Sequence, residues 1–339
     1  MLANWVEIRH GLVGRGLIIH HWDTDGICST RLLLEQLEAD NITPMIGEYT
    51  IPEEAYRIAE TYKWVMIVDM ALQEEDIQRI SEKAKVTIID HHSQPPLKMV
   101  QHINPVADGA DSENYPSCTW VINRLLSNVP DIYTVLGIVG DRGVRVKENP
   151  YFWSIIQDYL AKENLTFDDL ERMVNLLDSS FRVGHRHGVV EAPRILKQLN
   201  GPSDIMSYPD WLKNLDEIQV EVARVLSAPP NEIEGVALKL FSSKANIIST
   251  IAREMAWKRG LDTVVVNTGY FPDMDQVYAR SNRKDMTSLI EFGVKKGYSA
   301  GGKRDVLGAV VPKEETEEYV SVIVEYLSQQ IRNPPWTNS

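Results

Sequence analysis

Side chains that can bind metal ions follow three separate apolar runs of this 339-residue chain. They are His21, Asp23, Asp25, Asp69, Asp90, His91 and His92. Carboxylate oxygens and imidazole nitrogens suit Mn²⁺, Mg²⁺ or Zn²⁺, whereas the chain has only two cysteines to offer a thiolate site. Two such ions about 3.5–4 Å apart can clamp a phosphoryl group, generate hydroxide near neutral pH and stabilise a leaving oxygen. The residue types therefore favour metal-assisted phosphoester hydrolysis.

Each of these residues also has a simpler interpretation when it is taken alone. Asp69 is typical of a turn after a strand, and Asp25 could cap the helix that Gly26 opens. The pair His91 and His92 could be one buried, hydrogen-bonded imidazole and one exposed imidazole. The complete set favours a metal site, because carboxylates crowded at one sheet edge without cations would be electrostatically costly.

The elements that would position these residues alternate between strands and helices. Residues 16–21, 63–69 and 85–90 are nearly continuous apolar runs, typical of strands buried on both faces of a parallel sheet. Helical periodicity covers residues 28–39, 53–61 and 73–84. The order predicts a doubly wound α/β domain, in which ligands gather at the carboxyl ends of the strands.

The rest of the chain predicts helices and then a second α/β unit. Apolar residues at helical spacing cover residues 117–126 and 132–139, and a polar break is expected at residues 140–143. Strands are expected at residues 236–241, 262–267, 276–280 and 306–311, and helices at 247–259, 286–296 and 315–331. We predict a metal-binding domain over residues 1–185, a helical connector over 186–232 and a smaller α/β substrate domain over 233–339.

Composition narrows the functional classes. The formal net charge of −13 argues against a protein that grips duplex DNA through overall positive charge. Residues 239–304, however, hold 12 Lys and Arg against 6 Asp and Glu, a local net of +6 that suits a polyanionic strand or a solvated mixed-charge face. The N-terminus lacks the apolar core of a signal peptide, and no apolar run reaches about 18 residues. We expect a soluble, cytoplasmic protein without a membrane partner.

Four motifs resemble those of the DHH phosphoesterase superfamily, and in particular its archaeal RecJ-like exonucleases. They are the His-x-Asp-x-Asp-Gly run at residues 21–26, Asp69, the Asp-His-His run at 90–92 and the Gly-Asp pair at 140–141. The resemblance implies two Mn²⁺ ions, or Mg²⁺, with Asp69 as the bridge. The implied ligands are Asp23, Asp25, Asp69, His91 and Asp141, with His21 as a further candidate. His92, which would face the substrate phosphate, and Asp90 are the catalytic candidates.

Residues 233–339 resemble the DHH-associated substrate domain. The markers are residues 278–282 and the glycine-containing run 299–308, in which Lys303 stands where the family has a histidine. Candidate substrate contacts are Arg280, Ser281, Asn282, Gly301, Gly302, Lys303 and Arg304. Glycines would let backbone amides approach a phosphate, and Arg280 would pair with it bidentately. Tyr270, Tyr278 and Tyr298 are available for base stacking.

These observations predict a manganese-dependent, RecJ-like exonuclease that hydrolyses single-stranded DNA or RNA with metal-activated water. One alternative is a small-substrate member of the superfamily that acts on oligoribonucleotides, pAp-like nucleotides or cyclic dinucleotides. Another is a replisome accessory protein that binds the replicative helicase and has weak or no nuclease activity. The His185 and His187 pair could form a second metal site, although a polar loop between domains is the favoured interpretation.

Overall fold

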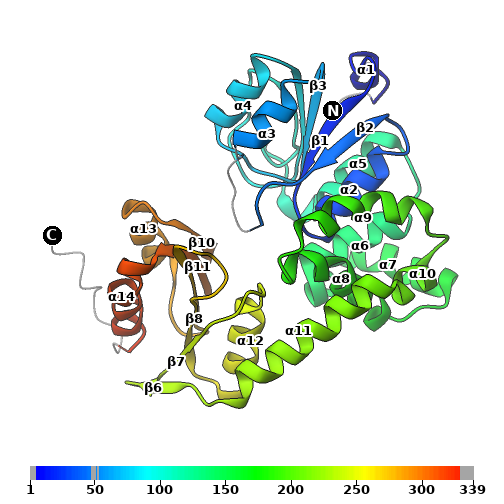
Figure 1. The fold of residues 1–339 in the computed structure, drawn as a ribbon. Helices are drawn as coiled ribbons and strands as arrows, with labels where there is room; N and C mark the ends of the chain where they lie inside the picture. Colours follow the sequence, from blue (N-terminus) through cyan, green and yellow to red (C-terminus); the bar gives the residue numbers. More distant parts are fainter. Residues whose placement is uncertain (1–4, 47–50, 52, 329–339) are drawn as a thin grey trace. The chain divides into compact units, whose positions relative to one another are not determined.

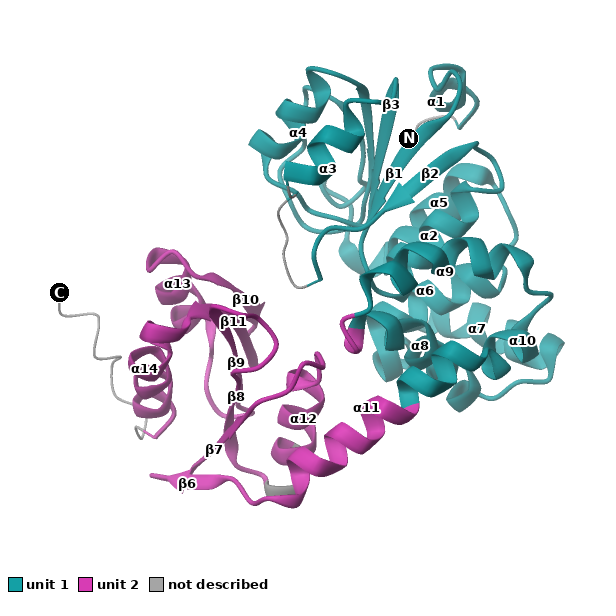
Figure 2. Cartoon of the chain, in the orientation of Figure 1, with its two compact units in different colours: residues 1–181, 185–215 teal, residues 182–184, 216–339 magenta. Residues whose placement is uncertain are grey.

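The computed structural model describes residues 5–46, 51 and 53–328. The chain divides into two compact units, and each is described here by itself (Figure 2). Unit 1 comprises residues 1–181 and 185–215, and unit 2 comprises residues 182–184 and 216–339. The boundary at residues 215 and 216 falls inside the long helix α11 (Pro209–Ser227).

Unit 1 contains a parallel five-stranded sheet in the order β2-β1-β3-β4-β5 (Figure 1). The strands are β1 (Gly16–His20), β2 (Ala39–Ile42), β3 (Trp64–Val68), β4 (Lys85–Ile89) and β5 (Gln101–Ile103). All residues of β1 and β3 are buried, as expected for central strands that are covered on both faces. Strands β2 and β5 were not predicted from the sequence, because their residues, ADNI and QHI, do not form an apolar run.

Helices cover both faces of this sheet, which confirms the doubly wound α/β prediction. On one face, α3 (Glu53–Ala59) and α4 (Glu74–Ser81) pack on the alternate residues Leu17 and Ile19 of β1. On the other face lie α2 (Thr24–Leu33), α5 (Cys118–Leu126) and α6 (Ile132–Arg142). Because the chain leaves β1 and β3 towards opposite faces, the carboxyl ends of these two neighbouring strands form the switch point of the sheet.

Two helix boundaries differ from the sequence prediction. The helix α2 begins at Thr24 instead of residue 28, because Asp23 caps it, and it ends at Leu33, so that residues 39–42 are free to form β2. The polar break expected at residues 140–143 was wrong for residues 140–142. Helix α6 continues through Gly140 and Asp141 to Arg142, and Gly143 then ends it with φ 52°.

The remaining elements of unit 1 are helical. They are α1 (Trp5–His10), η1 (Ser112–Asn114), η2 (Gly143–Glu148), α7 (Pro150–Glu163), α8 (Phe167–Arg182, whose last residue belongs to unit 2), α9 (Arg186–Gln198) and α10 (Pro202–Ser207). Helix α9 packs against α2, the helix that begins at the carboxyl end of β1. No helix in the described part of the chain is both long and apolar enough to cross a membrane.

Unit 2 is a smaller α/β unit with a mixed six-stranded sheet in the order β10-β11-β9-β8-β7-β6. The strands are β6 (Asn231–Ile233), β7 (Val236–Phe241), β8 (Asp262–Asn267), β9 (Met274–Arg280), β10 (Ser299–Lys303) and β11 (Val306–Pro312). The helices are α12 (Ile248–Arg259), α13 (Thr287–Lys295), η3 (Lys313–Glu315) and α14 (Thr316–Ser328). Among the described strands of this sheet, only β7 and β8 pair in parallel, and α12 connects them.

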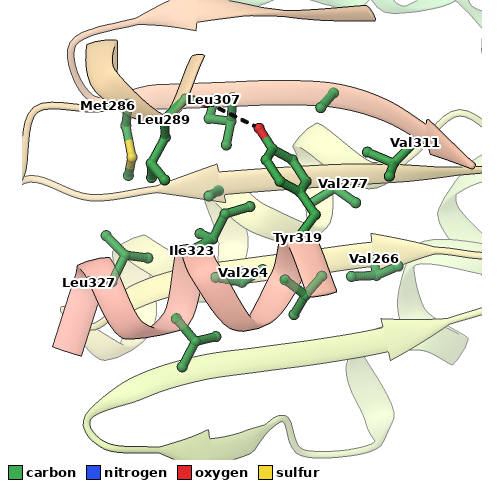
Figure 3. Close-up of a cluster of buried hydrophobic side chains, with 14 of the residues drawn as sticks. Val264, Val266, Val277, Met286, Leu289, Leu307, Val311, Tyr319, Ile323 and Leu327 are labelled. Atoms are coloured by element: carbon green, nitrogen blue, oxygen red, sulfur yellow. Dashed lines mark hydrogen bonds between the residues drawn. The ribbon is translucent and has the colours of Figure 1, made fainter. Parts of the chain in front are cut away.

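The core of unit 2 lies between the sheet and helices α13 and α14 (Figure 3). Val264, Val277 and Leu307 from three neighbouring strands contact Ile323 and Tyr319 from α14. The Tyr319 hydroxyl donates to the Leu289 carbonyl over 3.2 Å, so the one polar atom of this ring is paired inside the core. The predicted helix at residues 315–331 extends past Ser328 into residues that lie outside the described part.

Candidate metal centre

The carboxyl end of β1 is shaped by the first turn of α2. Asp23 is the N-cap of α2 and accepts a hydrogen bond from the Gly26 amide over 3.1 Å. Gly26 is required here, since an added Cβ would come within 2.4 Å of the His21 carbonyl oxygen. The capping interaction expected of Asp25 therefore belongs to Asp23, and the Asp25 side chain is directed elsewhere.

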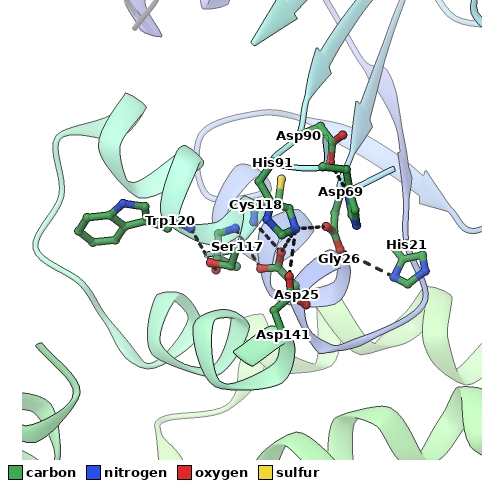
Figure 4. A network of polar contacts seen from close by, with 12 residues as sticks. His21, Asp25, Gly26, Asp69, Asp90, His91, Ser117, Cys118, Trp120 and Asp141 are labelled. Atoms are coloured by element: carbon green, nitrogen blue, oxygen red, sulfur yellow. Dashed lines mark hydrogen bonds and ion pairs between the residues drawn. The ribbon is translucent and has the colours of Figure 1, made fainter. Parts of the chain in front are cut away.

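The Asp25 carboxylate is held between α2 and the start of α5 (Figure 4). Its oxygens accept hydrogen bonds from the backbone amides of Cys118, over 2.6 Å, and Thr119, over 3.0 Å. Asp25 is fully buried. Donation from the N-terminus of a helix is a favourable environment for a carboxylate, and it fixes the orientation of this side chain.

Asp69 follows β3 and has an unusual conformation for a residue with a side chain. Its φ is 61°, in the left-handed region, and its amide donates to the Ile89 carbonyl over 3.0 Å. Asp69 is 1% exposed, and neither of its carboxylate oxygens accepts a hydrogen bond in the described structure. Two buried carboxylate oxygens without a donor are costly unless a cation satisfies them.

His91 brings carboxylates from three elements together. Its Nε2 lies 3.0 Å from Oδ2 of Asp141, 3.4 Å from Oδ1 of Asp69 and 3.9 Å from Oδ2 of Asp25. Its Nδ1 lies 3.2 Å from the Tyr115 carbonyl, so Nε2 is the nitrogen that faces the acidic cluster. Asp141 reaches the cluster from the last turn of α6.

His21 closes the other side of the cluster. Its Nδ1 lies 2.8 Å from Oδ2 of Asp23 and 3.8 Å from Oδ2 of Asp69. Within the described residues, the groups with geometry for a metal ion are His21, Asp23 and Asp69; Asp25, His91 and Asp141; and Asp69, His91 and His92. Asp69 belongs to two of these three groups, and their carboxylate and imidazole donors fit hard divalent cations.

The electrostatics of the cluster also fit a cation. Burial, followed by the nearby charge of Asp141, raises the pKa of Asp25 to about 6. Burial and repulsion from the neighbouring aspartates raise the pKa of Asp69 well above its usual range. Burial alone would lower the pKa of His91, but the hydrogen bond and charge of Asp141 raise it to about 9. Without metal, the cluster therefore retains protons that bound cations would displace.

Asp90 and His92 form a pair beside this cluster. Asp90 is fully buried, and its Oδ1 accepts from Nδ1 of His92 over 2.8 Å. Burial alone would raise the pKa of Asp90, but the hydrogen bond and the charge of His92 lower it. Gln94 donates to the other Asp90 oxygen over 2.9 Å, and Asn104 donates to the His92 carbonyl over 2.8 Å. The hydrogen bond to Asp90 thus orients the His92 side chain through Nδ1 and leaves Nε2 outside this contact. The His92 side chain is 47% exposed.

Sequence reasoning did not identify the residue that holds the first turn of α2. Asp178, on α8, accepts from both the amide and the hydroxyl of Thr24, over 2.9 Å and 2.7 Å. Thr24 stands between Asp23 and Asp25, so this contact positions both. The two partners are 154 residues apart, and a lone aspartate in an amphipathic helix carries no signal that could reveal the contact.

The substrate-contact candidates lie together in unit 2, on β9, β10 and the turns that follow β9 and β10. Arg280 ends β9 and is largely buried, and its Nε makes no hydrogen bond in the described structure. The Ser281 hydroxyl accepts from the amides of Arg283 and Lys284, so it shapes the turn in which Asn282 lies exposed. Arg304 is exposed and pairs with Asp285 over 2.9 Å.

The run 299–308, where glycines were expected to expose backbone amides, is a β-hairpin of β10 and β11. Gly301 pairs with Gly308, and open space lies beside Gly301. Gly302 has φ 152°, and a Cβ there would come within 2.0 Å of the Val306 carbonyl oxygen. The tight turn therefore requires glycine at this position, next to the exposed Lys303.

Two other sequence suggestions are changed by the structure. Tyr298 was wrong as a base-stacking candidate, because it is 7% exposed and its hydroxyl donates to Glu315 over 2.6 Å in the core of unit 2. The His185 and His187 rings are 6.3 Å apart, but they belong to no metal-competent group of the described residues.

Comparison with known proteins finds similarity to one family model and to several solved structures. Residues 15–138 match the model of the DHH family, N-terminal domain. A crystal structure of exonuclease RecJ bound to manganese is similar over 100% of this chain and 97% of its own, with 14% identity and a TM-score of 0.69. No curated protein sequence matches the chain.

Two further solved structures share the fold. RecJ of Thermus thermophilus with Mn²⁺ matches 97% of this chain with 14% identity and a TM-score of 0.67, and this chain spans only 54% of that protein. A pGpG-specific phosphodiesterase of Vibrio cholerae matches 92% of this chain and 98% of its own, with 12% identity and a TM-score of 0.50.

Proposed function

We propose that this chain is a DHH phosphoesterase and, more specifically, a manganese-dependent exonuclease that hydrolyses single-stranded DNA or RNA. The observation that carries the proposal is Asp69, whose two buried oxygens accept no hydrogen bond in the described structure and face ligand groups on both sides. Asp23, Asp25, Asp69, His91 and Asp141, with His21, would hold two divalent ions. Bound there, the ions would supply a hydroxide near neutral pH and neutralise charge on the phosphoryl group.

The contacts of His92 support a role for this residue in binding the substrate phosphate. Its Nδ1 is committed to Asp90, which fixes the tautomer and leaves Nε2 for an external group. A donor at Nε2 would stabilise negative charge that develops on a phosphate oxygen or on the leaving oxygen. Asp90 acts through His92 in this scheme, as an orienting residue.

Arg280 and Lys303 would bind phosphates on unit 2. The register pairs Arg280 with Val306 and Val306 with Lys303, and residues directly opposite one another share a face of the sheet. Two residues further along the same face, Tyr278 pairs with Gly308 and Gly308 pairs with Gly301. The tyrosine therefore lies beside two glycines, which have no side chain. Arg280 offers a guanidinium whose Nε has no partner in the described structure, and Lys303 offers a point charge.

The test is cleavage of end-labelled single-stranded 20-mers of DNA and RNA beside the dinucleotide pGpG, with Mn²⁺ or EDTA. We expect Mn²⁺-dependent loss of the long strands, and at least a 100-fold slower rate for Asp90→Ala/His91→Ala, since the double variant removes a ligand candidate and the partner of His92. Asp158→Ala/His187→Ala is the matched control, because both residues are exposed and outside the cluster.

Each alternative has its own outcome in this assay. Cleavage of pGpG without cleavage of either 20-mer would replace the exonuclease with a small-substrate phosphodiesterase. Equal rates for the wild type and the Asp90→Ala/His91→Ala variant would remove the catalytic assignment. Strand binding with no cleavage of any substrate would favour the helicase-accessory alternative.

A further inference from the structure

A basic and aromatic surface begins at Val144, three residues after Asp141. Helix α6 ends at Arg142, and η2 and the start of α7 follow directly. We define the ledge as Val144, Arg145, Lys147 and Tyr151. All four side chains are exposed, with Val144 60% and Tyr151 57% exposed. An exposed tyrosine close in sequence to two cations suits single-stranded nucleic acid, whose bases stack on aromatic rings and whose phosphates attract positive charge.

The segment that carries the ledge is tied to η1 by contacts within unit 1. Arg142 donates to Glu113 Oε1 over 2.7 Å and to the Ser112 carbonyl over 2.9 Å. Asn149, the N-cap of α7, donates to the Glu113 carbonyl over 3.1 Å. Both ends of η2 are therefore tied to the same short segment, and the ledge needs little ordering when a ligand binds.

The Tyr151 ring packs against two other aromatic rings. Its ring meets the rings of Phe152 and Trp120 edge to face, with centroids 5.1 Å and 6.1 Å apart. Trp120 is two residues from Cys118, whose amide donates to Asp25. Figure 4 shows Trp120 on the same helix start that carries Ser117 and Cys118. The exposed Arg124 lies over the Trp120 ring, 5.8 Å from its centroid.

The charges available on this surface are positive. Arg145 forms no ion pair with any described residue, so its guanidinium is available to a ligand. Lys147 lies over the Phe167 ring at 4.2 Å, with the ammonium still exposed. The acidic residue within the segment is Glu148. In a chain with net charge −13, a cationic and aromatic strip is complementary to a polyanion with unpaired bases.

We propose that the ledge binds the nucleotides adjacent to the scissile phosphate of a single-stranded nucleic acid, with a base on Tyr151 and phosphates on Arg145 and Lys147. The site rests on the proposed function for its substrate class, and it adds a strand contact on unit 1. Arg145 is four positions after Asp141 in the chain, so their Cα atoms lie at most about 14 Å apart. Nucleotides held at the metal centre therefore have neighbours within reach of the ledge.

The test is fluorescence anisotropy of a labelled single-stranded 20-mer with the full-length protein, with Ca²⁺ in place of Mn²⁺, over a range of salt concentrations. We expect Tyr151→Ala to weaken binding about 10-fold, and Tyr151→Phe to keep wild-type affinity, since stacking needs the ring and not the hydroxyl. Arg145→Ala should weaken binding and reduce the slope of log affinity against log salt by about 0.7.

The matched control is Arg57→Ala, which removes one exposed cation from α3 on the opposite face of the sheet. Equal affinities and salt slopes for Arg145→Ala and Arg57→Ala would overturn the proposal, and so would a wild type that does not bind the strand. Arg145 has no packing role in the described structure, so its variant remains informative if Tyr151→Ala is unstable. If the ledge binds the strand but Mn²⁺ supports no cleavage, the proposed exonuclease fails while the ledge stands.

Discussion

Gly137 of α6 lies directly against the Asp25 carboxylate: an added Cβ would come 2.3 Å from Oδ1 of Asp25 and 2.1 Å from Oγ1 of Thr119. The glycine therefore lets α6, which carries Asp141, approach α2, which carries Asp25. Alanine normally stabilises a helix interior by about 1 kcal/mol relative to glycine. At Gly137 the clash opposes this gain, because the neighbouring atoms belong to the metal centre.

We expect Gly137→Ala to weaken Mn²⁺ binding at least 10-fold in isothermal titration calorimetry. The matched control is Gly140→Ala in the same helix, which has the same gain in helix propensity and meets the Thr24 Cβ at 3.3 Å. We expect the control to bind Mn²⁺ within threefold of the wild type. Wild-type affinity in Gly137→Ala would show that α2 and α6 can separate without disturbing Asp25.

Asp178 should act on metal binding by holding the first turn of α2. It holds the amide and the hydroxyl of Thr24, between Asp23 and Asp25. We expect Asp178→Ala to weaken Mn²⁺ binding 10- to 100-fold, the range found when groups that orient metal ligands are removed. Asp178→Asn keeps an acceptor oxygen and should recover most of the affinity. If both variants bind Mn²⁺ equally well, the contact has no role in positioning.

The positions of the ligand candidates could be predicted because they depend on local patterns. Apolar runs end at His21, Asp69 and Asp90, and parallel strands bring such ends to one edge of a sheet. The first turn of α2 was harder, because Asp23 and Asp25 are polar and the helical periodicity starts only at Cys28. The N-cap geometry of Asp23 is what places the start of the helix at Thr24.

Sequence patterns could not predict contacts between residues that are far apart in the chain. Asp141 lies in a stretch where glycines predicted a break, yet α6 continues through it because Gly137 and Gly140 allow close packing on α2. The Tyr298 ring was expected at a surface, but the tertiary fold buries it against Tyr319. Residue types alone did not indicate which tyrosine faces solvent, since all of them suit both a core and a stacking surface.

Metal binding should release protons and become stronger as pH rises. Without metal, Asp25 has a pKa of about 6 and His91 a pKa of about 9, both above their usual values. Both groups must lose their protons to act as ligands, so cations compete with protons below these pKa values. We expect Mn²⁺ affinity to rise between pH 5.5 and pH 9, by up to about 10-fold per pH unit for each proton displaced.

Calorimetric titrations at pH 7 in PIPES and in Tris measure this release directly. The two buffers differ in ionisation enthalpy, so the observed binding enthalpy should differ by that amount multiplied by the number of protons released. At least one proton is expected, because His91 is largely protonated at this pH. Identical enthalpies in the two buffers would mean that the cluster is already deprotonated before it binds metal.

Arg280 should contribute to strand binding through the shape of its guanidinium as well as its charge. Its Nε is buried without a hydrogen-bond partner in the described structure, next to the row of residues that contains Gly301. We expect Arg280→Ala to raise the KM for a single-stranded 20-mer about 10-fold or more, because a charge-assisted, bidentate phosphate contact is lost. Arg280→Lys should recover only part of the loss, since an ammonium lacks the planar fork.

Arg283→Ala, which removes a nearby cation that pairs with Asp262, is the control and should leave KM within twofold. A wild-type KM in Arg280→Lys would show that only the positive charge of Arg280 matters. An unchanged KM in Arg280→Ala would show that Arg280 does not contact the substrate.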